Sequence, residues 1–152
     1  MRVSPSCLLL AAILGCATAQ YHTNVPIETR SLDDIYVAAK QETSGTKQPL
    51  QVFWGGDAGT QGDGVRRAWK QRFPDIPLTL TVDLSKYHDG RIDSAFFEGR
   101  HIADVTVLQT LQDWYRWRAQ NRLLYYKPAT FDNLFNGEKD LNGAFLGLFT
   151  YK

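Results

Sequence analysis

Three side chains that could bind a cation follow one another closely in the middle of the chain. Asp83, Tyr87 and His88 supply a carboxylate, a phenol and an imidazole, which suit a hard or borderline metal ion. No His or carboxylate lies three or four residues from His88, so a chelating pair on a helix is missing. We predict Asp83 as a solute ligand, with Tyr87 and His88 as metal ligands. In the alternative interpretation Asp83 caps a helix, Tyr87 is half-buried and His88 lies on a solvated face.

A glycine-rich segment, GGDAGTQGDG at 55–64, is the second place where the sequence predicts binding. Glycine lets a backbone approach a ligand closely, so Gly55, Gly56 and Asp57 are predicted ligand contacts. The segment lacks the Lys of a phosphate-binding loop and the spacing of a dinucleotide fingerprint. A plain strand-to-helix turn is the alternative interpretation.

Gln109 and Thr110 form the third predicted contact, because they directly follow an apolar run. Their side chains and the N–H of Leu111 could hold an anionic or hydroxylated solute, and a simple helix cap is the alternative. Trp114 and Trp117 alternate with arginines, but helical spacing predicts Trp114 in the core and Trp117 at its rim. We therefore do not interpret them as a surface for nucleic acid.

Catalytic motifs are missing from the sequence. It contains no GxSxG, no HExxH, no cysteine nucleophile and no convincing Ser/His/Asp set. The neighbouring carboxylates Asp33 and Asp34 fall at an exposed helix start. We predict a binding protein and not an enzyme.

Apolar spacing predicts an α/β fold. Helices are expected at 31–45, 61–73, 85–99 and 110–121, and strands at 50–54, 78–82, 103–108 and 144–151. Ser31, Ser85 and Thr110 are the expected helix caps, and Ile92, Ala95 and Phe96 are expected to face inward. Short connections between strands and helices imply a parallel sheet covered on both faces, which is a three-layer lobe. Three helix starts then meet at one edge, where open α/β sheets bind ligands.

The first nineteen residues have the pattern of a signal peptide. Arg2 precedes an apolar run at 7–16, and Ala17-Thr18-Ala19 fits a cleavage site. We predict an exported protein, either secreted or periplasmic, with a flexible segment at 20–30 and one domain at 31–152. A lipoprotein acylated at Cys16 is the alternative, because residues 13–16 loosely resemble a lipobox. Cleavage after Ala19 would remove both cysteines, so the domain is expected to fold without a disulfide.

The charge balance argues against nucleic acid and acidic membranes as partners. The chain has 17 basic and 16 acidic residues, and loss of Arg2 with the leader leaves a net charge of zero. Nor does any segment approach the roughly 20 apolar residues of a membrane-spanning helix.

Seven motifs together resemble one known family: FWGGD (53–57), RFPDI (72–76), VDLSKYH (82–88), ADV (103–105), QTLQD (109–113), YKPA (126–129) and NGAF (142–145). From Ser31 onward the chain resembles the first lobe of a type II periplasmic solute-binding protein, in the branch of ferric-iron transport components. The resemblance implies two α/β lobes that trap a solute, with Fe(III) as a candidate ligand, and places 144–151 where the chain enters the hinge. A second lobe is missing, so the sequence is either a fragment or a degenerate half.

Two rival functions remain open at this stage. The first is a secreted interaction module whose unpaired sheet edge docks a partner chain or a second copy. The second is a small secreted hydrolase, which the lack of a nucleophile–base pair disfavours.

Overall fold

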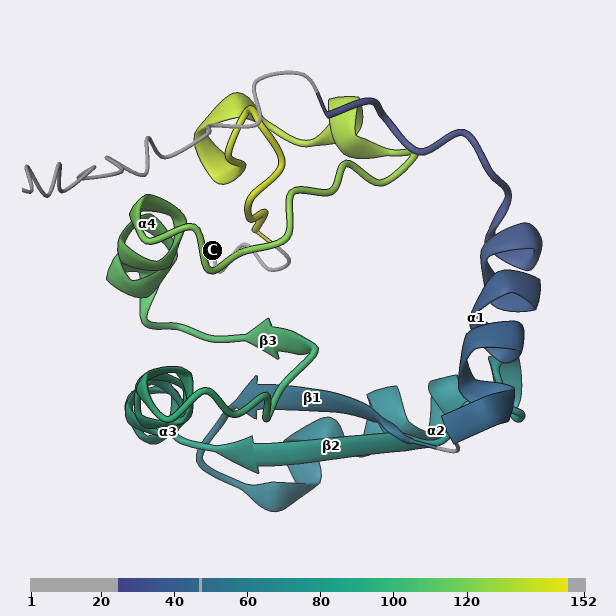
Figure 1. Ribbon diagram of the computed structural model, residues 1–152, viewed down its shortest axis with the longest axis horizontal. Coiled ribbons are helices and arrows are strands. Elements are labelled where there is room, and N and C mark those ends of the chain that lie inside the picture. The colour runs from purple at the N-terminus through teal and green to yellow at the C-terminus, as the bar shows by residue number, and fades with distance from the viewer. Residues whose placement is uncertain (1–24, 47, 148–152) are drawn as a thin grey trace, which may run out of the picture.

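The computed structural model describes residues 25–46 and 48–147, in which helices lie beside a small sheet and the irregular last part of the chain lies across from it (Figure 1). The predicted leader, its cleavage site and Cys16 lie outside these residues. The α-helices are α1 (Leu32–Thr46), α2 (Asp63–Arg72), α3 (Ser85–Phe97) and α4 (Leu111–Ala119). The strands are β1 (Leu50–Gly55), β2 (Leu78–Asp83) and β3 (Val105–Val107). Short 3₁₀ turns are η1 (Gly59–Gly62), η2 (Phe131–Asn133) and η3 (Asn136–Glu138).

The sheet is parallel throughout, with the strand order β2-β1-β3. Val52 of β1 lies opposite Leu80 of β2 and Val105 of β3. Strands alternate with helices along the chain, so the predicted α/β class with a parallel sheet is confirmed. The third strand is shorter than predicted. At its start the Asp104 N–H donates to the Gln51 carbonyl at 2.9 Å, while the Gln51 N–H donates to the Asp104 carboxylate at 2.8 Å.

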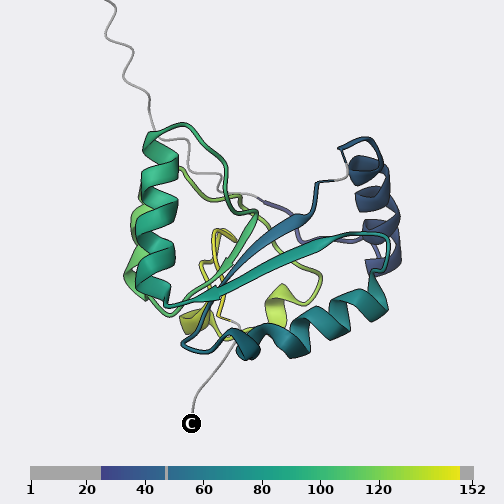
Figure 2. The ribbon, with the colours of Figure 1, turned by 90° about the horizontal axis from the view of Figure 1, so that it is seen from below.

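Helices cover the two faces of the sheet unequally (Figure 2). On one face, η1 and α2 pack against β2, and Arg66 of α2 donates to the Leu80 carbonyl at 2.8 Å. On the other face, the His88 ring of α3 stacks on Phe53 of β1, with ring centroids 4.5 Å apart. Helix α1 lies farther out and packs on the end of α2, where the Tyr36 and Phe73 rings are 5.2 Å apart.

Trp117, and not Trp114, is the buried tryptophan of α4. Trp117 is 2% exposed and its indole N–H donates to Asp93 of α3 at 2.9 Å, whereas Trp114 is only partly buried. The predicted assignment was therefore wrong. The side of α4 that faces α3 is polar and includes Arg116, which pairs with Asp89 and Asp93 of α3. Trp117 lies on this same side and is therefore buried between the two helices. Phe96 also differs from its prediction, since it is 49% exposed while Ala95 is fully buried.

The helix caps agree with the sequence in one case and differ in two. Ser31 and Asp34 form the expected reciprocal cap: each side chain accepts the backbone N–H of the other, at 3.2 and 3.1 Å. Ser85 lies inside the first turn of α3, after the cap residue Leu84. Thr110 occupies the cap position of α4, but its side chain makes no capping hydrogen bond. Both hydroxyls are therefore available for other contacts.

The chain after α4 is irregular. Asn121 ends the helix in the left-handed region, with φ 54°, as its predicted position suggested. A turn at 140–143 then brings Leu146 back to Lys139 in a single antiparallel bridge. No strand is present between residues 144 and 147, and the rest of the predicted strand lies outside the described residues. The chain curls here because the Asp140 carboxylate accepts the N–H groups of Asn142 and Ala144. At the other end, Ile27 bridges Lys127.

Candidate functional site

The predicted connections meet at one edge of the sheet. Register pairs Gly55 with Asp83 at the ends of β1 and β2, and β3 ends beside them at Val107. The Gly56 N–H donates to the Asp83 carbonyl at 2.9 Å, and the Gln109 N–H donates to the Ser85 hydroxyl at 2.9 Å. We call this region, residues 55–58, 83–88 and 107–110, the carboxyl edge. All eight predicted ligand residues belong to it.

The glycine-rich loop is closed by its own side chains. The Gln61 carboxamide oxygen accepts the N–H groups of Asp57 and Ala58, at 2.9 and 3.3 Å. A Cβ on Gly56 would come within 2.0 Å of that oxygen, and a Cβ on Gly55 within 2.2 Å of the Ser85 hydroxyl. A side chain at either glycine would therefore force a neighbouring side chain to move, and the backbone donors of Asp57 and Ala58 are already in use.

Asp83 is bound on both of its oxygens. One oxygen accepts the Leu84 N–H at 2.8 Å, and the other accepts a guanidinium N–H of Arg91 at 2.6 Å. The Arg91 hydrogen bond, with the Leu84 N–H, lowers the pKa of Asp83, so this carboxylate stays ionised. It therefore brings an ion pair, and not a free negative charge, to the carboxyl edge.

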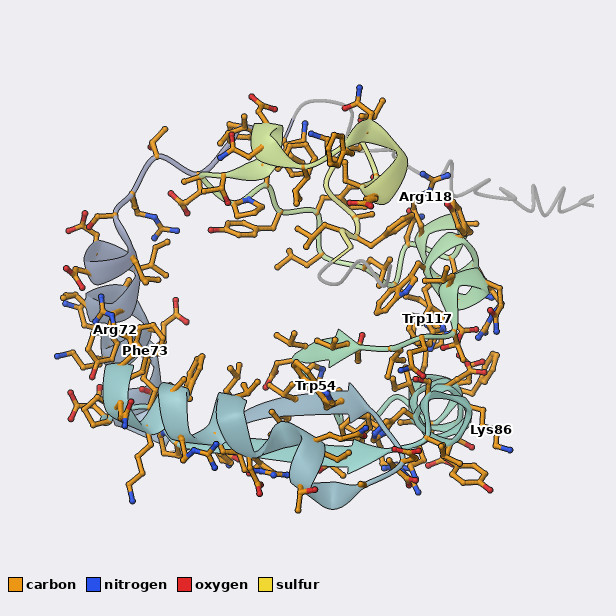
Figure 3. All side chains as sticks on the ribbon, turned by 180° about the vertical axis from the view of Figure 1, so that it is seen from behind. Trp54, Arg72, Phe73, Lys86, Trp117 and Arg118 are labelled. Atoms are coloured by element: carbon orange, nitrogen blue, oxygen red, sulfur yellow. The ribbon has the colours of Figure 1, made fainter. Side chains whose placement is uncertain are left out.

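Tyr87 and His88 are neighbours in sequence that face different surroundings. His88 is fully buried, with its Nε2 3.3 Å from the Trp54 carbonyl oxygen and its Nδ1 unpartnered among the described residues. Tyr87 is 50% exposed, and the Lys86 ammonium lies 5.2 Å from its ring centroid. Lys86 points outward from α3 (Figure 3). Within residues 25–46 and 48–147, no three His, Cys, Asp or Glu side chains are grouped to hold a metal ion.

Gln109 and Thr110 enter α4 in different environments. Gln109 is exposed, and its carbonyl accepts the Leu111 N–H at 3.0 Å. The Thr110 hydroxyl is buried and has no hydrogen-bond partner in the described structure. The third connection therefore offers one exposed carboxamide and one buried hydroxyl.

Sequence reasoning missed the residues that fix the edge in place. The Gln61 side chain accepts the Asp57 N–H, and the Arg91 side chain donates to the Asp83 carboxylate. The Ser85 hydroxyl, at the start of α3, accepts the Gln109 N–H just before α4. Asp113, to which the sequence analysis assigns no individual role, is 2% exposed and pairs with Arg116 at 3.0 Å. The three-residue spacing of Asp113 and Arg116 was a usable signal for that ion pair.

Comparison with known proteins adds no assignment: neither the protein-family models nor the curated proteins gave a match. Within the described residues, none of the helices has the length and apolar character needed to cross a membrane.

The close packing of Gly55 leads to a first prediction. Gly55→Ala should lower the free energy of unfolding by about 1–3 kcal/mol, because the new methyl group collides with Ser85. Gly59→Ala is the matched control, since nothing lies within 4 Å of a Cβ there and its φ is not left-handed. Urea unfolding measures both. Equal stability of the two variants would contradict this role for Gly55.

The buried His88 leads to a prediction about pH. Burial lowers the pKa of His88 below its ordinary 6.5, Arg91 lowers it further, and Asp83 and the Trp54 carbonyl oppose the shift. As the pH falls through about 6.5, His88 becomes protonated in the unfolded chain but stays neutral in the folded chain. The free energy of unfolding is therefore highest above pH 6.5 and decreases as the pH falls.

Urea unfolding between pH 8 and pH 5 measures this loss. His88→Phe keeps a ring against Phe53 but cannot titrate, so its stability should fall less steeply. His101→Gln is the control, because His101 is exposed and its Nε2 lies 2.7 Å from the Asp104 carboxylate. The explanation fails if the His88→Phe variant loses as much stability as the unmodified protein.

Proposed function

We propose that this protein binds a small ionic solute at the carboxyl edge, as an exported lobe of the solute-binding class. The observation that carries the proposal is the pairing of Gly55, Asp83 and the end of β3 in one parallel register. This register brings three connections and the starts of two α-helices to a single edge. Such edges are the usual ligand sites of open α/β sheets.

Side chains, and not the loop backbone, would recognise the solute. Gln61 and Ser85 already accept the N–H groups of Asp57, Ala58 and Gln109. The predicted ligand residues that remain exposed are Asp57, Tyr87 and Gln109, which carry a carboxylate, a phenol and a carboxamide. These oxygen-bearing groups suit a hard cation such as Fe(III), its anion complex, or an organic ion with hydrogen-bonding groups.

A single edge forms one wall of a binding site. A small-molecule pocket usually buries about 70–90% of its ligand, and the exposed groups named above lie on one side only. In the two-lobed proteins that the sequence resembles, a second lobe closes over the solute. We therefore expect weak binding by this chain alone and tighter binding when a second wall is present.

Thermal unfolding with added solutes tests the proposal. Fe(III) citrate, sodium phosphate, spermidine and thiamine are added separately, and at least one should raise the Tm because a ligand of the folded state stabilises it by mass action. A double change, Asp57→Asn with Gln109→Ala, should reduce that rise. Asp132→Asn changes the charge equally at an exposed position outside the edge and should leave the rise intact. If no solute raises the Tm above an ionic-strength control, the proposal is wrong.

A secreted interaction module is a second candidate, because large apolar side chains are exposed. Phe97, Leu124 and Phe135 are 80%, 86% and 78% exposed, and Val105 on the outer strand β3 is 45% exposed. Exposed apolar surface of this kind favours association with a partner or a second copy. Light scattering of the preparation used for the solute tests separates the two proposals, because a strict monomer at all concentrations contradicts self-association.

A further inference from the structure

Asparagine followed by glycine is a chemically unstable pair, and it occurs twice in the sequence, at 136–137 and 142–143. The backbone nitrogen of the glycine can attack the side-chain carbonyl carbon of the asparagine, because glycine has no Cβ to hinder the approach. The attack needs an accessible carboxamide, a glycine N–H without a partner and a backbone that can rotate. The fold therefore decides which of the two pairs can react.

The pair at 136–137 meets these conditions. Asn136 and Gly137 are both exposed in the single turn η3, and within the described residues neither the Asn136 carboxamide nor the Gly137 N–H makes a hydrogen bond. The turn is closed by a bond from the Glu138 N–H to the Phe135 carbonyl at 3.0 Å. Short 3₁₀ turns have poor hydrogen-bond geometry and open at little cost in free energy. The backbone at Asn136 can therefore rotate toward the reactive geometry.

The pair at 142–143 is held in place. The Gly143 N–H donates to the Asp140 carbonyl at 2.9 Å, and the Asn142 N–H donates to the Asp140 carboxylate at 3.2 Å. Gly143 is buried, and its carbonyl accepts the Tyr126 N–H at 2.9 Å. A Cβ on Gly143 would come within 2.8 Å of the Tyr126 carbonyl oxygen, so the two backbones are tightly packed. Rotation at Asn142 would break these contacts.

We propose that Asn136 is a site of spontaneous deamidation and that the fold protects Asn142 from the same reaction. The Gly137 nitrogen forms a bond to the Asn136 Cγ and gives its proton to solvent. The bond from Cγ to the side-chain nitrogen breaks, and that nitrogen takes a proton from solvent and leaves as ammonia. Water then opens the cyclic imide at either of its carbonyl groups. The products are aspartate, with the original backbone, and isoaspartate, whose backbone runs through the former side chain.

The modification would change both charge and shape at η3. Each product carries a carboxylate, so the net charge of the chain, +1 at pH 7, falls by one unit. The new charge lies next to Phe135, whose side chain is 78% exposed. In isoaspartate the backbone gains a methylene group between residues 136 and 137, inside the ring that the Glu138–Phe135 hydrogen bond closes. We expect that bond to break in the isoaspartyl form.

Storage of the full chain at pH 8 and at pH 5, followed by peptide mapping with mass spectrometry, tests the site. Conversion should be faster at pH 8, because the attacking nitrogen must lose its proton. At pH 8 we expect Asn136 to convert at least about tenfold faster than Asn142, whose hydrogen bonds must break first. Equal rates at the two positions, or no conversion of Asn136, would contradict the inference.

Unfolding the chain in urea separates the effect of the fold from that of the local sequence. Both asparagines precede a glycine, so their rates should become similar once the contacts of Gly143 are lost. If Asn142 stays unreactive in urea, the local sequence protects it and the fold does not, which overturns the proposed protection.

Two variants identify the reacting groups. Gly137→Ala should slow conversion of Asn136 at least several-fold, because a Cβ hinders the attacking nitrogen. This variant should fold normally, since nothing lies within 4 Å of a Cβ there and its φ is not left-handed. Asn136→Asp should remove most of the charge change seen by ion-exchange chromatography, and Asn142→Ser, the control, should leave it unchanged. Undiminished conversion in Gly137→Ala, or an undiminished charge change in Asn136→Asp, would show that this reaction does not occur at Asn136.

Discussion

The central strand β1 is the constraint on which the structure depends. It is hydrogen-bonded to β2 on one side and β3 on the other, in parallel register. Parallel strands end at the same edge, so this pairing alone places the three connections next to one another. Gly55 at the end of β1 then allows α3 to approach until the Ser85 hydroxyl meets the Gln109 N–H. The strand pairing therefore fixes both the positions of the helix starts and the carboxyl edge that they form.

The polar groups of the edge mostly satisfy one another. Gln61 closes the glycine-rich loop, and Arg91 holds Asp83. Each contact removes a group that could have bound a solute, but it also fixes the position of the groups that remain. A rigid edge with a few exposed side chains can orient a solute with little loss of conformational entropy.

Hydrogen bonds and ion pairs between charged side chains join helices α3 and α4. Asp93 alone accepts hydrogen bonds from Arg116, Trp117 and Arg122. This network is partly buried, and removing one of its members would leave a shielded charge without its partner.

The sequence by itself determined the local structure. Apolar periodicity and chain connectivity predicted the α/β class, the order of strands and helices, and the Ser31 cap, because these depend on neighbouring residues and on the rules for parallel connections. Tertiary packing decided the rest. It buried Trp117 and His88, and it made Gln61 and Ser85 hydrogen-bond acceptors for backbone N–H groups of the edge. It also left residues 144–147 outside the sheet. Those outcomes depend on contacts between distant segments, such as Trp117 with Asp93, which no local pattern contains.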